Sequence, residues 1–127
     1  GGEKMKNYIQ GIDHVQVAAP VGCEEEARDF YGNTIGMEEI PKPEELKKRG
    51  GCWFKCGNQE IHIGVERNFT PAKKAHPAFY VNEINEFKQT LIEQGVKVID
   101  DYARPDVIRF YVSDPFGNRI EFMQNKD

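Results

Sequence analysis

The strongest constraint on the fold is an internal repeat, in which the elements of residues 11–66 recur in the same order in residues 75–124. Each half begins with a stretch in which apolar and polar residues alternate. A histidine stands at its head, His14 in the first half and His76 in the second. Each half continues with apolar residues at helical spacing and ends with two alternating stretches around a Gly-Asn dipeptide. The histidine precedes that dipeptide by nearly the same distance in both halves, so chance does not explain the match.

The local patterns predict the elements of each half. Ala27, Phe30 and Tyr31 have the spacing of one face of a helix, and glutamates occupy the first turn before them. Gly57-Asn58 lies between two runs of alternating apolar and polar residues, a pattern that indicates a β-hairpin. For the first half we expect a strand at 11–20, a helix at 24–33, a short segment at 37–40 and a hairpin of 51–56 with 59–66. For the second half we expect a strand at 75–82, a helix at 83–94, a strand at 96–99 and a hairpin of 108–113 with 119–124.

Both halves therefore have the order βαβββ, and the predicted fold class is α+β. A chain of 127 residues, 39% of them hydrophobic, is long enough to bury a core. We expect a single domain at 9–124, made of module one at about 9–66, a linker at 67–74 and module two at about 75–124.

The composition excludes several kinds of partner. The formal net charge is -4 and Lys and Arg form no stripe, so nucleic acid is not expected. No apolar run approaches the ~18 residues of a membrane span, and no secretory signal opens the chain, so we expect a cytoplasmic protein. Cys52 and Cys56 have a spacing found in zinc sites, but no second pair completes four ligands. Buried thiols in a reducing compartment are the better interpretation.

The repeat brings together four residues of the types that bind metals. Each module has one such residue at the head of its first strand and one on its last strand, and these are His14 and His62 in module one, His76 and Glu121 in module two. Three imidazoles and a carboxylate suit zinc, iron, cobalt, nickel or manganese, with positions left for water or substrate. Taken singly, each residue has an ordinary structural explanation, such as a strand start for His14, a loop hydrogen bond for His76 or an ion pair of Glu121 with Arg119 or Arg109.

Hairpin geometry predicts which side chains share a face with these residues. A two-residue turn at Gly57-Asn58 pairs Trp53 with His62 and Lys55 with Glu60. A five-residue D-P-F-G-N loop pairs Tyr111 with Glu121 and Arg109 with Met123. The opposite faces would pack under the helices through an apolar set that comprises Phe54, Ile61, Ile63, Phe110, Val112, Ile120 and Phe122. A register shift of one residue would reverse every face.

The paired βαβββ modules, the histidines at 14 and 76 and the ending D-P-F-G-N-R-I-E-F (114–122) resemble the vicinal oxygen chelate superfamily. That superfamily includes glyoxalase I, methylmalonyl-CoA epimerase, extradiol dioxygenases and bleomycin-binding resistance proteins. The resemblance covers residues 9–124 and implies a cupped, incomplete barrel around one divalent metal, with dimers usual among small members. It places metal ligands at His14, His76 and Glu121. His62 stands where glyoxalase I has a glutamate that binds metal and moves protons, so the sequence departs from glyoxalase I here.

The leading interpretation is a metal-dependent, glyoxalase-like enzyme of the lyase or isomerase type. One divalent ion (zinc, nickel, cobalt, manganese or iron) would bind two oxygens of a small substrate and favour an enediolate-like intermediate. Glu121 and His62 are the candidate catalytic groups. The substrate pocket would be lined by Trp53, Lys55, Arg109 and Tyr111. Lys55, Arg109 and Arg119 would bind an anionic substrate, unless they pair as ordinary surface charges.

Two other functions are compatible with the same residues. Two histidines and one glutamate form the facial triad of an iron(II) dioxygenase of the extradiol type, with His62 as a nearby acid or base. A drug- or metabolite-binding resistance protein is the third candidate, although such members typically lack the metal ligands. Exposed sheet edges and the resemblance both lead us to expect a homodimer.

Overall fold

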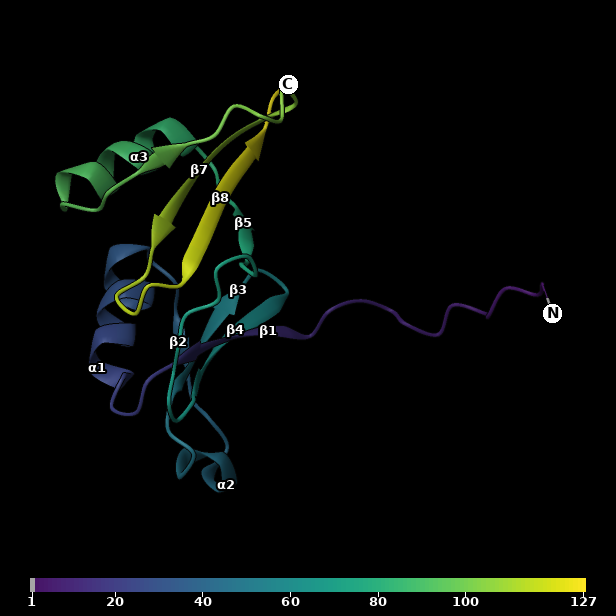
Figure 1. Cartoon of the computed structure of the whole chain (residues 1–127), viewed down its shortest axis with the longest axis vertical. Helices are drawn as coiled ribbons and strands as arrows, with labels where there is room; N and C mark the ends of the chain where they lie inside the picture. Colours follow the sequence, from purple (N-terminus) through teal and green to yellow (C-terminus); the bar gives the residue numbers. More distant parts are fainter. Residues whose placement is uncertain (1) are drawn as a thin grey trace.

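The computed structural model describes residues 2–127 of the chain (Figure 1). Module one contains β1 (His14–Ala19), α1 (Glu24–Ala27), the π-helix η1 (Arg28–Thr34), β2 (Glu39–Ile40), α2 (Glu44–Lys47), β3 (Cys52–Cys56) and β4 (Gln59–Val65). Module two contains β5 (Ala78–Tyr80), α3 (Ile84–Glu93), β6 (Ile99–Asp100), β7 (Val107–Ser113) and β8 (Arg119–Asn125).

Each module forms one four-stranded sheet, and the two sheets have the same topology. The strand orders are β1-β4-β3-β2 and β5-β8-β7-β6, and in each sheet the first strand runs parallel to the last. The sheets do not close into a barrel, and α1, η1 and α3 lie on the same side of the pair (Figure 1). The α+β fold of two βαβββ modules is therefore confirmed.

Both predicted hairpin registers are confirmed. Trp53 pairs with His62 and Lys55 with Glu60 across the first turn. Across the second hairpin Tyr111 pairs with Glu121, as the five-residue loop requires. Because side chains alternate along a strand, these registers fix which residues face the helices and which face away from them.

The helix-facing sides of the two sheets merge into one apolar core. Phe54 and Phe110 are fully buried in it, and residues from both modules belong to the same buried cluster. Phe87 of α3 makes an edge contact with Phe122 of β8, with ring centroids 4.9 Å apart. Tyr31 of η1 lies 5.9 Å from the Phe54 ring. Burial of this shared apolar surface is the main force that holds the modules together.

Two buried hydrogen bonds join the modules at the β7–β8 loop. The Tyr31 hydroxyl donates to Asp114 Oδ2 at 2.7 Å, and the Asn118 amide donates to the Ala18 carbonyl at 2.8 Å. Asp114 also accepts bonds from the backbone N–H groups of Phe116 and Asn118, which holds the D-P-F-G-N loop in shape. Burial and the negative charge of Asp114 raise the pKa of the Tyr31 phenol far above its usual value. The phenol therefore remains a donor at any physiological pH.

The expected helix at 24–33 is present, but most of it winds as a π-helix. The Ile35 N–H donates to the Phe30 carbonyl, five residues back, at 2.9 Å. The consecutive aromatic side chains Phe30 and Tyr31 lie in this π-helix and are both buried. Local apolar spacing could not show this, because it fits either winding.

Two strand boundaries in module two differ from the prediction. The strand expected at 96–99 is only Ile99–Asp100, because the Val96 N–H caps α3 by donating to the Leu91 carbonyl at 3.0 Å. The strand expected from residue 75 begins at Ala78. Pro77 has no N–H for a sheet ladder, so His76 precedes the strand instead of opening it.

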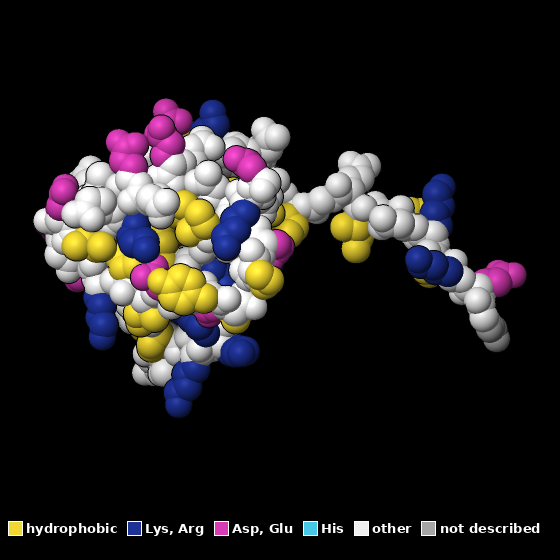
Figure 2. Space-filling view, turned by 90° about the horizontal axis from the view of Figure 1, so that it is seen from above, with side chains coloured by type: hydrophobic (Ala, Val, Ile, Leu, Met, Phe, Trp, Pro, Cys, Tyr) yellow, Lys and Arg dark blue, Asp and Glu magenta, His cyan; other side chains and the backbone are white. Residues whose placement is uncertain are grey.

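An N-terminal arm of residues 2–13 has no helix or strand and projects from the body (Figure 2). Its apolar side chains are largely exposed, with Tyr8 at 71% and Ile9 at 80%. No helix within residues 2–127 is both long and apolar enough to cross a membrane.

Candidate functional site

The four ligand-type residues lie on or beside the sheet faces that point away from α1, η1 and α3. His14 opens β1, and His62 lies near the centre of β4 on the same face. Glu121 is on β8, and its N–H donates to the Pro77 carbonyl at 3.0 Å, which holds His76 next to it. His14, His62 and Glu121 therefore lie on the strands predicted from the sequence, whereas His76 lies just before the strand that it was predicted to open.

His76 and Glu121 form a close pair in module two. His76 Nε2 lies 2.9 Å from Glu121 Oε1, and the glutamate is only 4% exposed. His76 Nδ1 lies 2.9 Å from the Lys74 carbonyl, to which it can only donate. The ring therefore keeps Nε2 toward the carboxylate, as in histidines that bind metals through Nε2.

The separation of this pair fits two ligands of one ion. At bond lengths near 2.1 Å, two neighbouring donors lie about 3.0 Å apart around an octahedral ion and about 3.4 Å apart around a tetrahedral one. The observed 2.9 Å between His76 Nε2 and Glu121 Oε1 is close to the octahedral separation. With Nδ1 donating to Lys74, the Nε2 and Oε1 atoms are two acceptors facing each other. A shared proton or a bound cation has to lie between them.

Arg109 fixes the second oxygen of the same carboxylate. Its guanidinium lies 3.4 Å from Glu121 Oε2 and 3.2 Å from Asp101 Oδ1. The side chain is 14% exposed, and its Nε is buried with no hydrogen-bond partner in residues 2–127. Burial and the charge of Glu121 raise the pKa of Tyr111, so this phenol stays neutral beside the carboxylate.

Module one presents a stack of three rings. The His62 ring lies parallel to Trp53, with centroids 3.9 Å apart, and the His14 ring covers its other face at 4.1 Å. His62 Nε2 contacts Glu60 Oε1 at 2.9 Å. His14 Nδ1 contacts Asp13 Oδ2 at 2.9 Å, which leaves its Nε2 free.

This stack prevents His14 and His62 from binding one ion together as they stand. An imidazole nitrogen directs its lone pair in the plane of the ring. The planes of His14 and His62 are 14° from parallel, and the ring centroids are 4.1 Å apart. A single ion cannot lie in both planes. His62 is 5% exposed and occupied by Glu60, whereas His14 is exposed, so His14 is the one free to reach an ion.

The two pairs are not gathered into one centre within the chain. Across residues 2–127, no group of three or more His, Cys, Asp or Glu side chains is arranged to hold a metal ion. Within residues 2–127 the four residues therefore stand as two separate pairs, one in each module.

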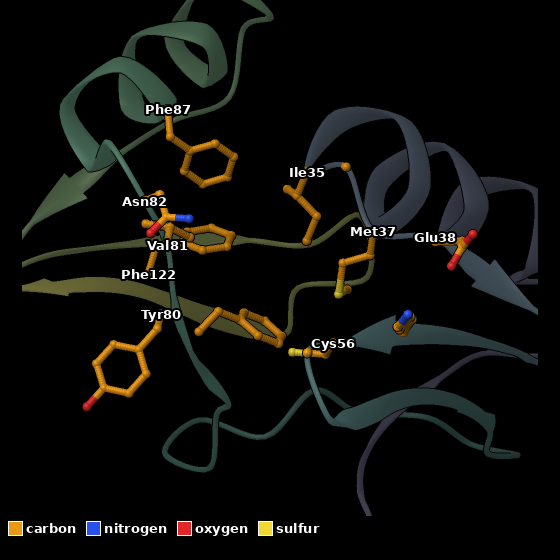
Figure 3. Close-up of a pocket in the computed structure, with 13 residues that line it drawn as sticks. Ile35, Met37, Glu38, Cys56, Tyr80, Val81, Asn82, Phe87 and Phe122 are labelled. Carbon is orange, nitrogen blue, oxygen red and sulfur yellow. The ribbon is translucent and has the colours of Figure 1, made fainter.

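Two hollows of similar size lie in different parts of the molecule. One of about 370 Å³ is bordered by His76, Arg119, Gln16 and the 66–72 segment, next to the module-two pair. The other, of about 440 Å³, lies between the modules on the helix side, where Ile35 and Met37 face Phe87 (Figure 3). It contains none of the four ligand-type residues, whereas the first hollow is bordered by His76.

The predicted pocket residues have different surroundings. Trp53 and Tyr111 lie against the histidines of their own modules, the latter 5.5 Å from His76 between ring centroids. Arg109 supports Glu121. Lys55 borders the apolar hollow of Figure 3. Asp13 and Lys74, which anchor the two leading histidines, were not among the predicted site residues, because a backbone carbonyl and a loop aspartate leave no recognisable pattern.

Comparison with known proteins agrees with this architecture. The sequence profile described as "Glyoxalase/Bleomycin resistance protein/Dioxygenase superfamily" matches residues 11–122. None of the curated proteins compared matches the chain. A solved structure from Bacillus anthracis, assigned to the glyoxalase family, is 88% identical with a TM-score of 0.94, covering 96% of this chain and 100% of that one.

Two more distant solved structures show how widely this fold is used. A lactoylglutathione lyase from Agrobacterium tumefaciens is 21% identical with a TM-score of 0.73, covering 93% of this chain and 96% of that one. An antibiotic binding protein from a Streptomyces species is 22% identical with a TM-score of 0.75, covering 95% and 100%. At such identities the likeness concerns the fold alone.

Proposed function

Because the chain belongs to the Glyoxalase/Bleomycin resistance protein/Dioxygenase superfamily, we propose that it catalyses a metal-dependent reaction of the lyase or isomerase type. The substrate would be a small molecule that offers two neighbouring oxygens to the metal. The observation that carries this proposal is the pair of His76 with the buried Glu121, in which the two side chains are 2.9 Å apart and His76 Nδ1 is anchored on the Lys74 carbonyl.

We assign the direct ligands to His14, His76 and Glu121. Both histidines have Nδ1 held by the segment just before them, through Asp13 and Lys74, and both leave Nε2 available. A divalent ion bound there would act as a Lewis acid toward a substrate carbonyl. This donor set suits zinc, nickel, cobalt, manganese or iron.

His62 has a different role in this proposal. Its ring supports His14 by stacking, and its Nε2 faces Glu60, an arrangement in which a carboxylate orients an imidazole. His62 is thus the group placed to move a proton beside the centre, together with Glu121. Trp53 covers the other face of the His62 ring and keeps it in this orientation.

A complete centre would combine His14 of one copy of the chain with His76 and Glu121 of a second copy. The separation of the two pairs within one chain supports this arrangement. We therefore predict a homodimer in solution, with a sedimentation mass near twice the 14.6 kDa of the chain. A monomer at micromolar concentration that still binds one metal ion per chain would contradict the shared centre.

The function is tested by metal analysis and by assay. Protein purified without chelators should contain close to one divalent ion per chain. The reconstituted protein should isomerise adducts of 2-oxoaldehydes with small thiols, and chelation should remove that activity. Stoichiometric metal without activity on any such adduct would reject the lyase or isomerase assignment. Tight binding of an intact drug or metabolite would then favour a binding protein.

The ring stack also favours a second candidate function. With His62 excluded from direct ligation, the remaining two histidines and one glutamate form the triad typical of iron(II) dioxygenases. Activity that requires ferrous iron and consumes oxygen with a catechol would establish this function. Activity with zinc or nickel in the absence of oxygen would exclude it.

Metal binding should quench the fluorescence of Trp53, the only tryptophan of the chain. Its indole stacks on His62, which stacks on His14, so an ion bound by His14 would lie close to it. Saturable quenching is expected when cobalt or copper is added to metal-free protein. Zinc is the matched control, because its filled d shell binds the same donors with little quenching. Demonstrated cobalt binding with unchanged fluorescence would contradict the proximity.

A further inference from the structure

Arg119 is a cation on the module-two face that has no anionic partner within residues 2–127. Its guanidinium lies over the Tyr111 ring, 4.0 Å from the centroid. The other two arginines of this module are paired, Arg104 with Asp106 at 2.9 Å and Arg109 with Asp101 and Glu121. Arg119 is therefore the guanidinium here that remains free for a ligand.

The Tyr111 ring supports the Arg119 guanidinium. Tyr111 is only 8% exposed, and cation–π attraction favours the position of the guanidinium over its ring. This contact uses none of the guanidinium's N–H donors in a hydrogen bond, so they can still bind a ligand. That planar fork matches a carboxylate, which it can hold through two parallel hydrogen bonds.

Arg119 borders the same hollow as His76. This hollow measures about 370 Å³, a volume suited to a small ligand. The Asn118 amide, also at its border, already donates to Ala18 and Asp114. Glu66 is an acid at the same border, so the hollow favours one anionic group at Arg119 and disfavours a second.

We propose that Arg119 determines specificity by binding a carboxylate of the substrate, which makes the substrate class small monocarboxylic acids with two chelating oxygens. This rests on the proposed function for the position of the oxygens near His76 and Glu121. The binding of the carboxylate itself depends only on Arg119 and the Tyr111 support. The two parts can therefore be tested separately.

The test uses metal-free protein and two simple probes of nearly equal shape, propionate and its neutral analogue propionamide. Binding is followed at constant ionic strength through the NMR signals of the Arg119 and Tyr111 amides and the Arg119 Nε–H. Propionate should shift these signals saturably, and propionamide should not. Arg119→Gln should weaken propionate binding on the order of tenfold or more, as expected for hydrogen bonds between charged groups.

Two further variants sharpen the result. Arg119→Lys keeps the charge but loses the planar fork, so it should bind propionate more weakly than the native protein and better than Arg119→Gln. Lys97→Gln removes one exposed positive charge elsewhere in module two and should bind like the native protein. Equal affinity of native protein and Arg119→Gln, or equal affinity for the two probes, would overturn the proposal.

Measuring the metal bound by the native protein and by Arg119→Gln distinguishes a failure of this proposal from a failure of the proposed function. Arg119→Gln should retain the divalent ion, because Arg119 is not among the proposed ligands. If the native protein binds propionate through Arg119 but holds no metal, the carboxylate site stands and the metal-dependent function fails. If it holds metal and Arg119→Gln binds propionate unchanged, the carboxylate site fails alone.

Discussion

Replacing His76 or Glu121 by alanine is expected to abolish tight binding of the divalent ion. Each change removes one of three proposed ligands and leaves the other member of the 2.9 Å pair alone. Two protein ligands do not hold a catalytic ion of this kind firmly, since such sites use at least three. Isothermal titration of metal-free protein with zinc or cobalt measures the effect.

His62→Ala is expected to be milder and serves as the internal comparison. His62 supports His14 through the stack, and loss of such an orienting group typically costs about 10–100-fold in affinity. Glu86→Ala, on the first turn of α3, removes an exposed carboxylate on the helix side and should leave binding unchanged. Native-like binding by His76→Ala would reject the metal centre. Equal damage from His62→Ala and His76→Ala would instead favour four ligands.

Asp114→Ala is expected to be the most destabilising single change at the junction of the modules. The carboxylate accepts bonds from Tyr31, Phe116 and Asn118, and it is 5% exposed. Its removal leaves several buried donors without partners, each costing about 1–3 kcal/mol. We expect the free energy of unfolding to fall by about 4 kcal/mol, and thermal denaturation to shift downward by on the order of 15 °C.

Tyr31→Phe is the matched control for this prediction. It removes only the hydroxyl at one end of the 2.7 Å bond and keeps the ring in the core. The expected loss is about 1 kcal/mol. If both variants lose the same small amount, the Asp114 network does not hold the loop against module one. Measurement of both by chemical denaturation at the same pH makes the comparison direct.

The sequence alone was sufficient to predict the module architecture and the faces of the sheets, because both depend on local patterns. Gly57-Asn58 allows only a tight turn, so the pairing of Trp53 with His62 follows from counting. The D-P-F-G-N loop likewise fixes Tyr111 opposite Glu121. Since alternation then assigns every other side chain to one face, His62 and Glu121 could be placed on the helix-free side without a structure.

Where a local pattern fits two conformations, tertiary packing determines which one forms. Apolar spacing in 24–33 fits both an α-helix and a π-helix, and only the structure shows that the chain forms a π-helix from Arg28 onward, with Phe30 and Tyr31 both buried. The strand expected at 96–99 begins only at Ile99, because the Val96 N–H caps α3 at the Leu91 carbonyl. These outcomes depend on competing partners elsewhere in the chain, which a local pattern does not contain.

The grouping of the candidate site was decided only by the tertiary structure. The repeat makes His14, His62, His76 and Glu121 equivalent, but equivalence within two modules does not say how the modules lie relative to each other. In the packed structure the two sheets share one core that contains Phe54 and Phe110, and the four residues form two pairs with no group of three or more within residues 2–127. Ring orientation is likewise set by neighbours in space, since the His14–His62 stack needs strands that pair across more than 40 residues of chain. Side-chain contacts between distant segments depend on how the backbone packs. Sequence patterns could therefore identify the ligand-type residues, but only the structure showed which of their atoms face each other.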